Sequence, residues 1–445
     1  MVSGGVALIL LLVAIVLIVY FTGKLKVNAF VVLIMIAFLF GLSIGMPALN
    51  VVKNIKDGFG GTLSSIGIVI VAGTIIGIIL EKTGAALSMT QAILKVVGKE
   101  RSPLAMSIAG YVVSIPVFCD SGYVIMTPLN KALAKESGNS MAVMAIALAT
   151  GLYATHTMVP PTPGPIAAAG ITGADLGMVI LYGLIAALPA MLAGYFWAIT
   201  VGKKYNIESD VEESYSDLIK KYGKLPSAFM SFLPLVTPIV LILLKSVADL
   251  PSKPFGKDSW LTPALSFIGD PVTALIIGVL ISLLLVKKGE MGTAVDQWMS
   301  AGIKDAAIIL AITGAGGSFG KVLQASPIVD FIKTNMTGLN MGIFLPFIIA
   351  AALKTAQGSS TVAIITTATI LAPLLGTLGL NPALTVIAIG AGSMVVSHAN
   401  DSYFWVVSQF SNMPVNTAYK AYTSATAVEG VVAMIMVAIM GIFIH

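Results

Sequence analysis

The sequence predicts an all-α polytopic membrane protein built from two inverted-topology repeats, and three observations lead to that fold class. Of the 445 residues, 57% are hydrophobic and only 10% are charged, with a mean hydropathy of +0.98. A soluble domain carries about 25% charged residues, so most of the outer surface must face lipid. Uncharged apolar runs recur along the whole chain, and its two halves share polar and glycine patterns in the same order. We therefore expect about ten transmembrane helices and two re-entrant helical hairpins.

The transmembrane helices follow from the apolar runs, because a bilayer core needs about 20 apolar residues in a helix. Run 6–22 has no cationic segment before it and no small-residue cleavage pattern after it. It is therefore predicted to be a retained first helix and not a signal peptide. The other predicted spans are 28–49, 62–80, 141–171, 176–201, 228–248, 262–286, 306–320, 382–412 and 421–444.

Two apolar runs, at about 103–134 and 341–375, are interrupted near their centres. The polar or glycine residues that interrupt them are Cys119-Asp120-Ser121-Gly122 and Gln357-Gly358-Ser359-Ser360-Thr361. Each half-segment is too short to cross the bilayer core. We therefore predict that both runs enter and leave the membrane on the same side, as re-entrant hairpins.

The distribution of lysines predicts the orientation and the domain division. If the first helix runs from outside to inside, most of the 25 cationic residues fall on the cytoplasmic side. This positive-inside bias supports ten spans with both termini outside. The only sizeable polar loop, 203–227, is then a cytoplasmic linker. It separates a first repeat, 1–202, from a second repeat, 228–445.

The two halves can be aligned at an offset of 238 to 243 residues. With five spans in each half, the second copy must lie upside down in the bilayer. Inverted repeats with discontinuous segments near their axis are the architecture of secondary transporters. The aligned positions are Ser121-Gly122-Tyr123-Val124 with Ser359-Ser360-Thr361-Val362, His156 with His398, Gly73 with Gly316 and Gly77 with Gly320.

Two long helices are also predicted to be interrupted. One break lies within 155–165, where four prolines in six residues cannot continue a helix; the other lies at 397–402. Unwound backbone at membrane depth persists only when it is buried in protein or lines an aqueous cavity. The breaks and the hairpin tips thus predict a cavity at mid-depth, where half-helix N-termini favour an anion. The simpler alternative is that the breaks are only kinks.

Four motifs in this order resemble the gluconate permease (GntP) family, over essentially the whole chain. The resemblance implies proton-coupled uptake of gluconate or a related hydroxy acid across the bacterial inner membrane, with D-serine carriers among the relatives. It also implies homodimers in which a hairpin-bearing domain moves as an elevator. The chain has Asp120 where many members have glutamate, and Thr162 where many have histidine, which favours a shorter acid such as glycerate. The motifs are Phe118-Cys119-Asp120-Ser121-Gly122-Tyr123-Val124, the Thr155-His156 to Pro165 run, Gly358-Ser359-Ser360-Thr361-Val362-Ala363 and Ser397-His398-Ala399-Asn400-Asp401-Ser402-Tyr403-Phe404-Trp405.

Polar groups at the tips and breaks are the candidate ligands of a small hydroxy acid, because they can donate or accept hydrogen bonds. The alternative for any one hydroxyl is a bond to its own helix backbone. Lys354 either attracts the anionic substrate or pairs with Asp120 or Asp401. The predicted substrate-binding residues are Ser121, Gly122, Thr157, Lys354, Gly358, Ser359, Ser360, Thr361, His398 and Asn400.

Asp120, Asp401 and His156 are the predicted proton-coupling residues. The two carboxylates are the ionisable groups deepest in the predicted cavity, where a carboxyl group can carry a proton across the membrane. Histidine exchanges a proton near neutral pH. The alternatives are structural pairing for the carboxylates and a neutral, backbone-bonded ring for both His156 and His398. Glu429, inside the last helix, is a weaker candidate for the same task.

Several other functions are excluded or weakened. No basic block indicates nucleic-acid binding. The single cysteine and the absence of an HExxH pattern give no metal or other cofactor site. The stretch 314–320 imitates a nucleotide-binding loop but has no preceding strand, so it is predicted to be a helix-packing face. A channel or an intramembrane aspartyl enzyme would not explain the repeat. We therefore expect no enzyme but a symporter, whose partners are a hydroxycarboxylate anion, protons and lipid.

Overall fold

The computed structural model describes residues 1–210, 224–249, 254–255, 259–328, 331, 342–399 and 401–444. These residues form helices and connecting turns, and no strand occurs among them. The all-α fold class predicted from the sequence is confirmed.

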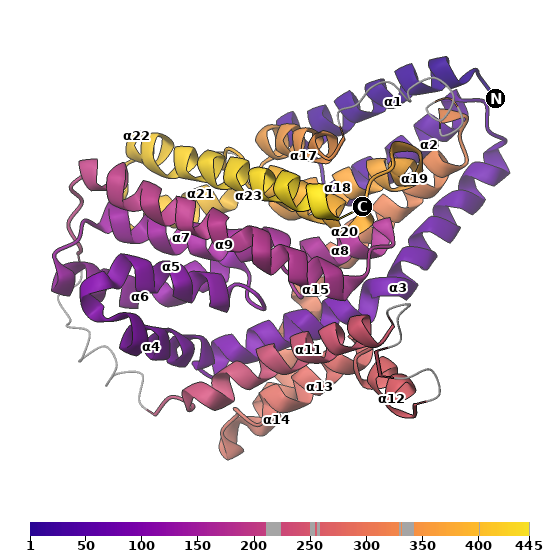
Figure 1. Cartoon of the computed structure of the whole chain (residues 1–445). Coiled ribbons are helices and arrows are strands. Elements are labelled where there is room, and N and C mark those ends of the chain that lie inside the picture. Colours follow the sequence, from indigo (N-terminus) through magenta and orange to yellow (C-terminus); the bar gives the residue numbers. More distant parts are fainter. Residues whose placement is uncertain are drawn as a thin grey trace.

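The first half of the chain contains nine α-helices, of which α5 and α6 are the arms of the first predicted hairpin. The long α3 runs diagonally across one side of the molecule in Figure 1. The bounds are α1 (Gly4–Val19), α2 (Ala29–Ser43), α3 (Ala48–Lys82), α4 (Ala85–Val97), α5 (Ser102–Val113), α6 (Cys119–Ser137), α7 (Met141–Met158), α8 (Pro163–Thr172) and α9 (Leu176–Thr200).

The described residues of the second half contain a similar series, with α17 and α18 as the arms of the second hairpin. The bounds are α11 (Ala228–Ala248), α12 (Leu261–Ile268), α13 (Pro271–Leu283), α14 (Met291–Thr293), α15 (Met299–Gln324), α17 (Phe344–Gln357), α18 (Ser360–Leu371), α19 (Leu375–Leu378), α20 (Pro382–Gly392), α21 (Ser402–Phe410), α22 (Val415–Ala418) and α23 (Ser424–Phe443). Short 3₁₀ or π turns adjoin several of these helices: η1 (Tyr20–Lys24), η2 (Lys99–Arg101), η3 (Gly202–Lys204), η4 (Lys288–Glu290), η5 (Ala294–Trp298), η6 (Ala372–Leu374) and η7 (Tyr419–Thr423).

The helices of the described residues are long and apolar enough for a multi-pass membrane protein. Seven helical stretches could cross a membrane by length and composition, or up to nine if each of two bent pairs is one span. Eight of these nine lie on predicted spans. The ninth, Ser360–Leu378, is the second arm of the second hairpin with its extension. The two other predicted spans correspond to shorter helices, α2 and the broken pair α20 and α21.

Polar side chains at the helix N-termini explain several boundaries. Ser140 accepts a hydrogen bond from Ala142 N at 3.2 Å, and Asp175 accepts one from Met178 N at 2.8 Å. Asn381 caps α20 in the same way. Each cap satisfies an N–H group that has no partner within its own helix. The start of these helices is therefore encoded locally.

The series of elements repeats, as the sequence predicts. The first series has a long helix (α3), a hairpin (α5 and α6), a broken helix (α7 and α8) and a last helix (α9). The second series has the same order, with α15, then α17 and α18, then α20 and α21, and finally α23. The equivalent helices α3 and α15 pack antiparallel: Thr74 Oγ1 donates to Gly302 O at 3.0 Å, and Ser318 Oγ donates to Ile55 O at 2.9 Å. A two-fold axis in the membrane plane brings equivalent helices together in this way.

The glycine-rich stretch of α15 is a packing face, as predicted. A Cβ atom at Gly317 would lie 2.5 Å from Gly58 O, and one at Gly314 would lie 2.5 Å from the ring of Phe59. Both contacts are with α3. Small residues here allow the two backbones to approach closely.

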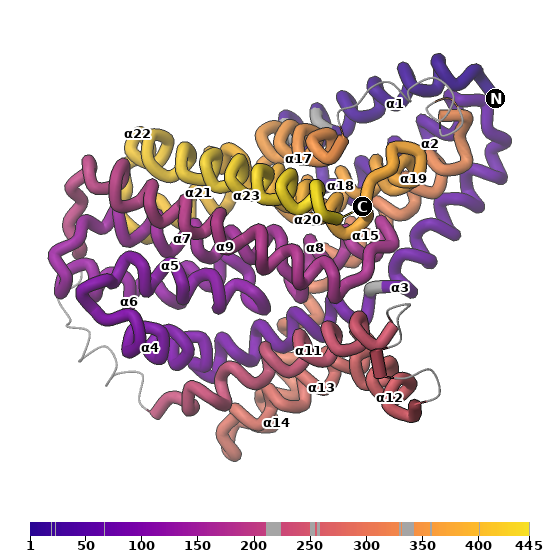
Figure 2. Tube along the Cα trace, viewed as in Figure 1, coloured from indigo at the N-terminus to yellow at the C-terminus, as the bar shows by residue number. Residues whose placement is uncertain are grey.

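Two hydrophobic cores divide the molecule, and each takes helices from both halves of the chain. The first core includes α5, α6, α7, α9, α20, α21 and α23; the second includes α1, α2, α3, α13 and α15. The C-terminal α23 accordingly lies beside α9 (Figure 2). Helix α18 contacts both, with Ile364 and Ala368 in the first core and Ile365 and Ile370 in the second. The second hairpin therefore lies between the two cores.

Candidate functional site

The four broken segments meet in one region, as the sequence predicts. Ser402, which begins α21, donates a hydrogen bond to Asp120 at the start of α6, at 3.3 Å. The Phe118 and His156 rings lie 5.9 Å apart between their centroids. A Cβ atom on Gly164 of α8 would lie 3.8 Å from Thr361 Cα of α18. Both hairpin tips and both helix breaks thus contribute to the candidate site.

Lys354 and Asp401 form a buried ion pair at the second hairpin. Lys354 Nζ lies 2.5 Å from Asp401 Oδ2, and the side chains are 0% and 5% exposed. Lys354 Nζ also donates to the carbonyl oxygen of Gly358, at the hairpin tip. Asp401 accepts further hydrogen bonds from Ser397 Oγ at 2.5 Å and Tyr403 N at 3.1 Å. Of the alternatives that the sequence leaves open for Lys354, pairing with Asp401 is therefore the arrangement observed.

Tyr153 of α7 connects this ion pair to the start of α18. Its ring lies beneath Lys354 Nζ, 5.6 Å from nitrogen to centroid. Its hydroxyl lies 2.6 Å from Ser360 Oγ and donates to Ser393 O at 3.3 Å. An ammonium group at this distance from a tyrosine face is attracted by the ring quadrupole. Tyr153 therefore contacts the cation and the hairpin tip at once.

Asp120 has a different environment at the first hairpin. Besides the bond from Ser402, its nearest partner is Cys119 Sγ at 3.7 Å. Among the described residues no lysine, arginine or histidine nitrogen lies within ion-pairing distance of it. The N-cap residue of α6, Phe118, makes no side-chain cap. The tip of the first hairpin thus combines a carboxylate that has no ion pair among the described residues with the positive end of a helix dipole.

The two predicted histidines lie in the same region. His156 is 6% exposed, and its Nδ1 atom has no hydrogen-bond partner among the described residues. His398 Nε2 forms a 2.9 Å hydrogen bond with the carbonyl oxygen of Thr355 in α17. The backbone-bonded alternative therefore describes His398, whereas one nitrogen of His156 remains available.

Three of the remaining predicted ligands have structural contacts. Gly122 packs on α7, because a Cβ atom there would lie 2.8 Å from Leu152. Thr157 Oγ1 donates to Tyr153 O at 3.2 Å, within its own helix. Ser359 caps α18 and accepts from Val362 N at 3.3 Å. These are the local contacts that the simpler alternative predicts for such residues.

Ser121 and Thr361 are half-buried at the hairpin tips. Ser121 lines a cavity of about 10 Å³ between the first hairpin and α3, together with Gly77 and Glu81. This volume is about that of one water-sized probe, so little space remains beside Ser121 in this conformation. Asn400, the other predicted ligand, lies outside the described residues.

Three further residues of the site were not predicted. Ser397 and Ser402 flank the second break and bond Asp401 and Asp120, respectively. Tyr153 bonds Ser360. Ser402 follows Asp401 directly in the sequence. Tyr153 precedes His156 by three residues, so these two side chains lie on the same face of α7. That spacing is the signal that could have identified Tyr153.

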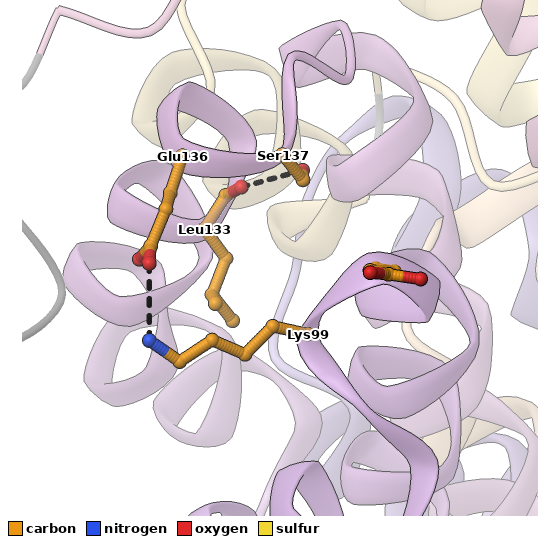
Figure 3. A pocket seen from close by; sticks show the side chains of 5 residues that line it. Lys99, Leu133, Glu136 and Ser137 are labelled. Carbon is orange, nitrogen blue, oxygen red and sulfur yellow. Dashed lines mark hydrogen bonds and ion pairs between the residues drawn. The ribbon is translucent and has the colours of Figure 1, made fainter.

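The larger surface cavities lie away from these residues. One of about 390 Å³ lies where the two arms of the first hairpin end, and Lys99 there forms a 3.0 Å ion pair with Glu136 (Figure 3). Two others, of about 340 and 440 Å³, lie around Ser65 and Gly173. We identify the candidate site by its chemistry, because charged groups, helix termini and both repeats converge at the tips and not at these hollows.

Comparisons with known proteins identify the family and the fold. Residues 6–443 match the sequence profile of the GntP family permease. The chain is 35% identical to a gluconate permease of Pseudomonas aeruginosa, over 94% of each chain. It is 34% identical to the D-serine transporter DsdX of Escherichia coli O6:H1, over 95% of this chain and 96% of that one. The crystal structure of the Alcanivorax borkumensis YdaH transporter, described as having an unusual topology, is similar in fold, with a TM-score of 0.68, 15% identity and coverage of 93% and 98%.

Proposed function

Since the chain belongs to the GntP family of permeases, we propose that it is a secondary active transporter that takes up a small hydroxy monocarboxylate, such as gluconate, together with protons. The proposed location is the bacterial inner membrane, and the proposed assembly is a homodimer. The alternative substrate is a shorter acid, glycerate or D-serine. Membership of a permease family identifies a transport protein and not an enzyme.

One observation carries the proposal: an unpaired carboxylate and a balanced ion pair meet at the tips of two repeat-related hairpins. The pair of Lys354 and Asp401 contributes no net charge. The N-terminus of α6 has no side-chain cap and presents the positive end of the helix dipole, which suits a substrate carboxylate. Ser121, Ser360 and Thr361 offer hydroxyls to the hydroxyl groups of the substrate.

The coupling follows from the charges. With Asp120 ionised and no substrate, the site carries one negative charge. An anionic substrate would raise this to two, and two anions in a poorly hydrated site repel each other strongly. If Asp120 accepts a proton when the anion binds, the net charge of the site remains one negative charge. Anion binding and proton binding are then linked, each favouring the other.

The proposed movement is alternating access, in which the helices of the first core move past those of the second. The division into two cores provides two separately packed bodies. Each hairpin is proposed to end at mid-depth and to close the site from one side of the membrane, which argues against an open channel. Crossing the membrane is costly for an uncompensated charge, so the anion crosses more readily with its proton, when the site carries one negative charge, than without it, when the site carries two.

The substrate assignment rests on the relatives and on Thr162. The relatives include both a gluconate permease and a D-serine transporter. Thr162 is buried, and its hydroxyl donates to Val159 O at 2.6 Å. The hydroxyl is therefore already used within its own segment. This contact favours a shorter acid, because a longer polyol chain needs an additional ligand.

The test is uptake of radiolabelled gluconate, glycerate and D-serine into proteoliposomes, each under a proton gradient, a sodium gradient or neither. We expect one acid to accumulate above equilibrium only under the inward proton gradient. Flux that merely equilibrates under every gradient would contradict the symport mechanism and favour a channel or uniporter. Accumulation driven by sodium alone would contradict proton coupling.

A further inference from the structure

The ammonium group of Lys354 has the surroundings of a bound cation. Its partners are the Asp401 carboxylate at 2.5 Å, the Gly358 carbonyl oxygen and the face of Tyr153, with 5.6 Å to the ring centroid. The side chain is completely buried. Asp401 is held in turn by Ser397 Oγ at 2.5 Å. The three groups come from a hairpin tip, a helix break and a neighbouring helix.

These partners are the ligand types that hold a coupling cation in inverted-repeat transporters. There, unwound backbone carbonyls and the C-terminal ends of half-helices coordinate sodium. Gly358 follows the last residue of α17, and its φ of +94° lets the chain leave the helix there and turn toward α18. The negative end of the α17 dipole therefore points at Lys354 Nζ. A carboxylate completes a set of oxygen ligands that a small metal cation would also accept.

The first hairpin lacks this feature. At the offset of 238 that aligns Ser121 with Ser359, the position equivalent to Lys354 is Pro116. The Pro116 carbonyl lies against Gly77 of α3, where an added Cβ atom would come within 2.4 Å. The repeat therefore supplies a permanent cation to one tip only.

We infer that the Lys354 ammonium group takes the place of a coupling metal cation, so that the second hairpin closes without sodium. Removal of this side chain then creates a site for a small monovalent cation. The inference rests on the proposed function, in which the proton bound at the first hairpin is the only coupled ion. A buried ion pair contributes little net stability compared with apolar residues of similar size. Its presence here is better explained by a requirement for a positive charge at the tip of the second hairpin.

The experiment uses the Lys354→Ala variant in proteoliposomes under a proton gradient, with choline, sodium or methylammonium as the added cation. Choline is too large for the vacated space and serves as the inert reference. Lys245→Ala is the matched control, since Lys245 pairs with Asp270 at 3.4 Å, outside the site. We expect uptake by Lys354→Ala to fall at least a hundredfold in choline and to recover at least tenfold in sodium or methylammonium. Wild type and Lys245→Ala should not respond to the added cation.

A second measurement keeps the inference testable if Lys354→Ala is inactive. The melting temperature of Lys354→Ala should rise with sodium or methylammonium, whereas that of the double variant Lys354→Ala/Asp401→Asn, which lacks the carboxylate, should not. Full activity of Lys354→Ala in choline, or a melting temperature that no small cation changes, would overturn the inference. Absence of uptake by the wild type would instead overturn the proposed function, so the two failures are distinguishable.

Discussion

The two hairpins are copies of one structural element, yet their tips have opposite chemistry. At the second tip, Lys354 and Asp401 are paired, and Ser359 caps the following helix. At the first tip, Asp120 has no cationic partner among the described residues, and α6 is uncapped. One tip therefore has a fixed charge, and the other can change its charge. In the proposed symport this difference favours Asp120 over Asp401 as the group that takes up the proton, because the ammonium group of Lys354 favours the ionised form of Asp401.

The hairpins also differ in their contacts with the second core. The equivalent glycines are Gly77 on α3 and Gly320 on α15. A Cβ atom on Gly77 would lie 2.4 Å from Pro116 O at the tip of the first hairpin, whereas one on Gly320 would lie 3.5 Å from Thr369, far along α18. An inverted repeat would give equal contacts in a symmetric state. The tip of the first hairpin therefore lies against α3 at Gly77, whereas the equivalent Gly320 of α15 meets the second hairpin away from its tip.

The largest expected effect is that of Asp401→Asn at the second tip. The change leaves Lys354 buried without a counter-charge, which costs about 3–5 kcal/mol. We expect a large fall in the melting temperature and loss of uptake, measured on purified protein and in proteoliposomes. The Lys354→Ala/Asp401→Asn variant removes both charges and should recover most of the lost stability. Equal stability of Asp401→Asn and wild type would show that the pair is not fixed.

Asp120→Asn at the first tip should separate function from stability. Asp120 has no ion pair among the described residues, so we expect a stability change within about 1 kcal/mol. Proton-driven accumulation should be lost, while exchange of labelled for unlabelled substrate continues and becomes independent of pH. Uptake of labelled acid with and without a pH gradient measures the loss, and exchange provides the control. Accumulation at the wild-type level would remove Asp120 from the coupling mechanism.

The paired variants Gly77→Ala and Gly320→Ala test the unequal contacts of the hairpins. A methyl group at Gly77 collides with the Pro116 backbone, and such overpacking costs about 1–3 kcal/mol. The same change at Gly320 meets only ordinary contacts. We expect slower uptake and a lower melting temperature for Gly77→Ala alone. Equal behaviour of the two variants would indicate that the unequal contacts do not describe the protein in a bilayer.

Tyr153→Phe should have a moderate effect at the second tip. It removes the hydroxyl that bonds Ser360 and leaves the ring beneath Lys354. Loss of one such hydrogen bond corresponds to about 1 kcal/mol, or roughly fivefold. We expect this factor in the KM for uptake, with a smaller change in the maximal rate. Tyr123→Phe, whose hydroxyl bonds Ser411 in the first core, is the control and should leave KM unchanged.

The smallest effect concerns the segment that follows α9. The hydrogen bonds from Lys131 and Asn412 lower the pKa of Asp210 below its usual value of 3.8. A lowered carboxyl pKa stabilises the folded state at neutral pH, and this contribution disappears as the pH falls through the folded-state pKa. Because the Asp210 side chain is about half exposed, Asp210→Asn should cost at most about 1 kcal/mol. Melting curves should differ slightly at pH 7 and converge as the pH falls below 3.8 through the folded-state pKa; a difference that grows on acidification would contradict this assignment.

Much of the fold could be predicted because the bilayer restricts it strongly. Apolar runs and their central interruptions predict the hairpins, and Gly358 lies at the second tip, as expected for a reversal of the chain. The convergence of Asp120, Asp401 and Lys354 follows from the repeat, since equivalent breaks meet at its axis. The grouping of helices into two cores could not be predicted, because it depends on tertiary packing between the two halves.

The partner of each polar side chain was also beyond prediction. The sequence left Lys354 to pair with Asp120, Asp401 or substrate, and only the three-dimensional arrangement selects Asp401. Thr157 and Ser359 have the right chemistry for ligands, yet their hydroxyls bond local backbone. The role of Tyr153 depends on its distance from Ser360, a residue 207 positions away. Spacing along one segment carries no information on such contacts.

The most direct test of the account counts protons and substrate together. A pH-sensitive dye inside proteoliposomes would report acidification when labelled substrate is added outside without any imposed gradient, for wild type and Asp120→Asn at matched rates of exchange. The account predicts a fixed number of protons per anion for wild type and no substrate-dependent acidification for Asp120→Asn. Acidification by the variant at the wild-type ratio would contradict the claim that the first hairpin carries the proton.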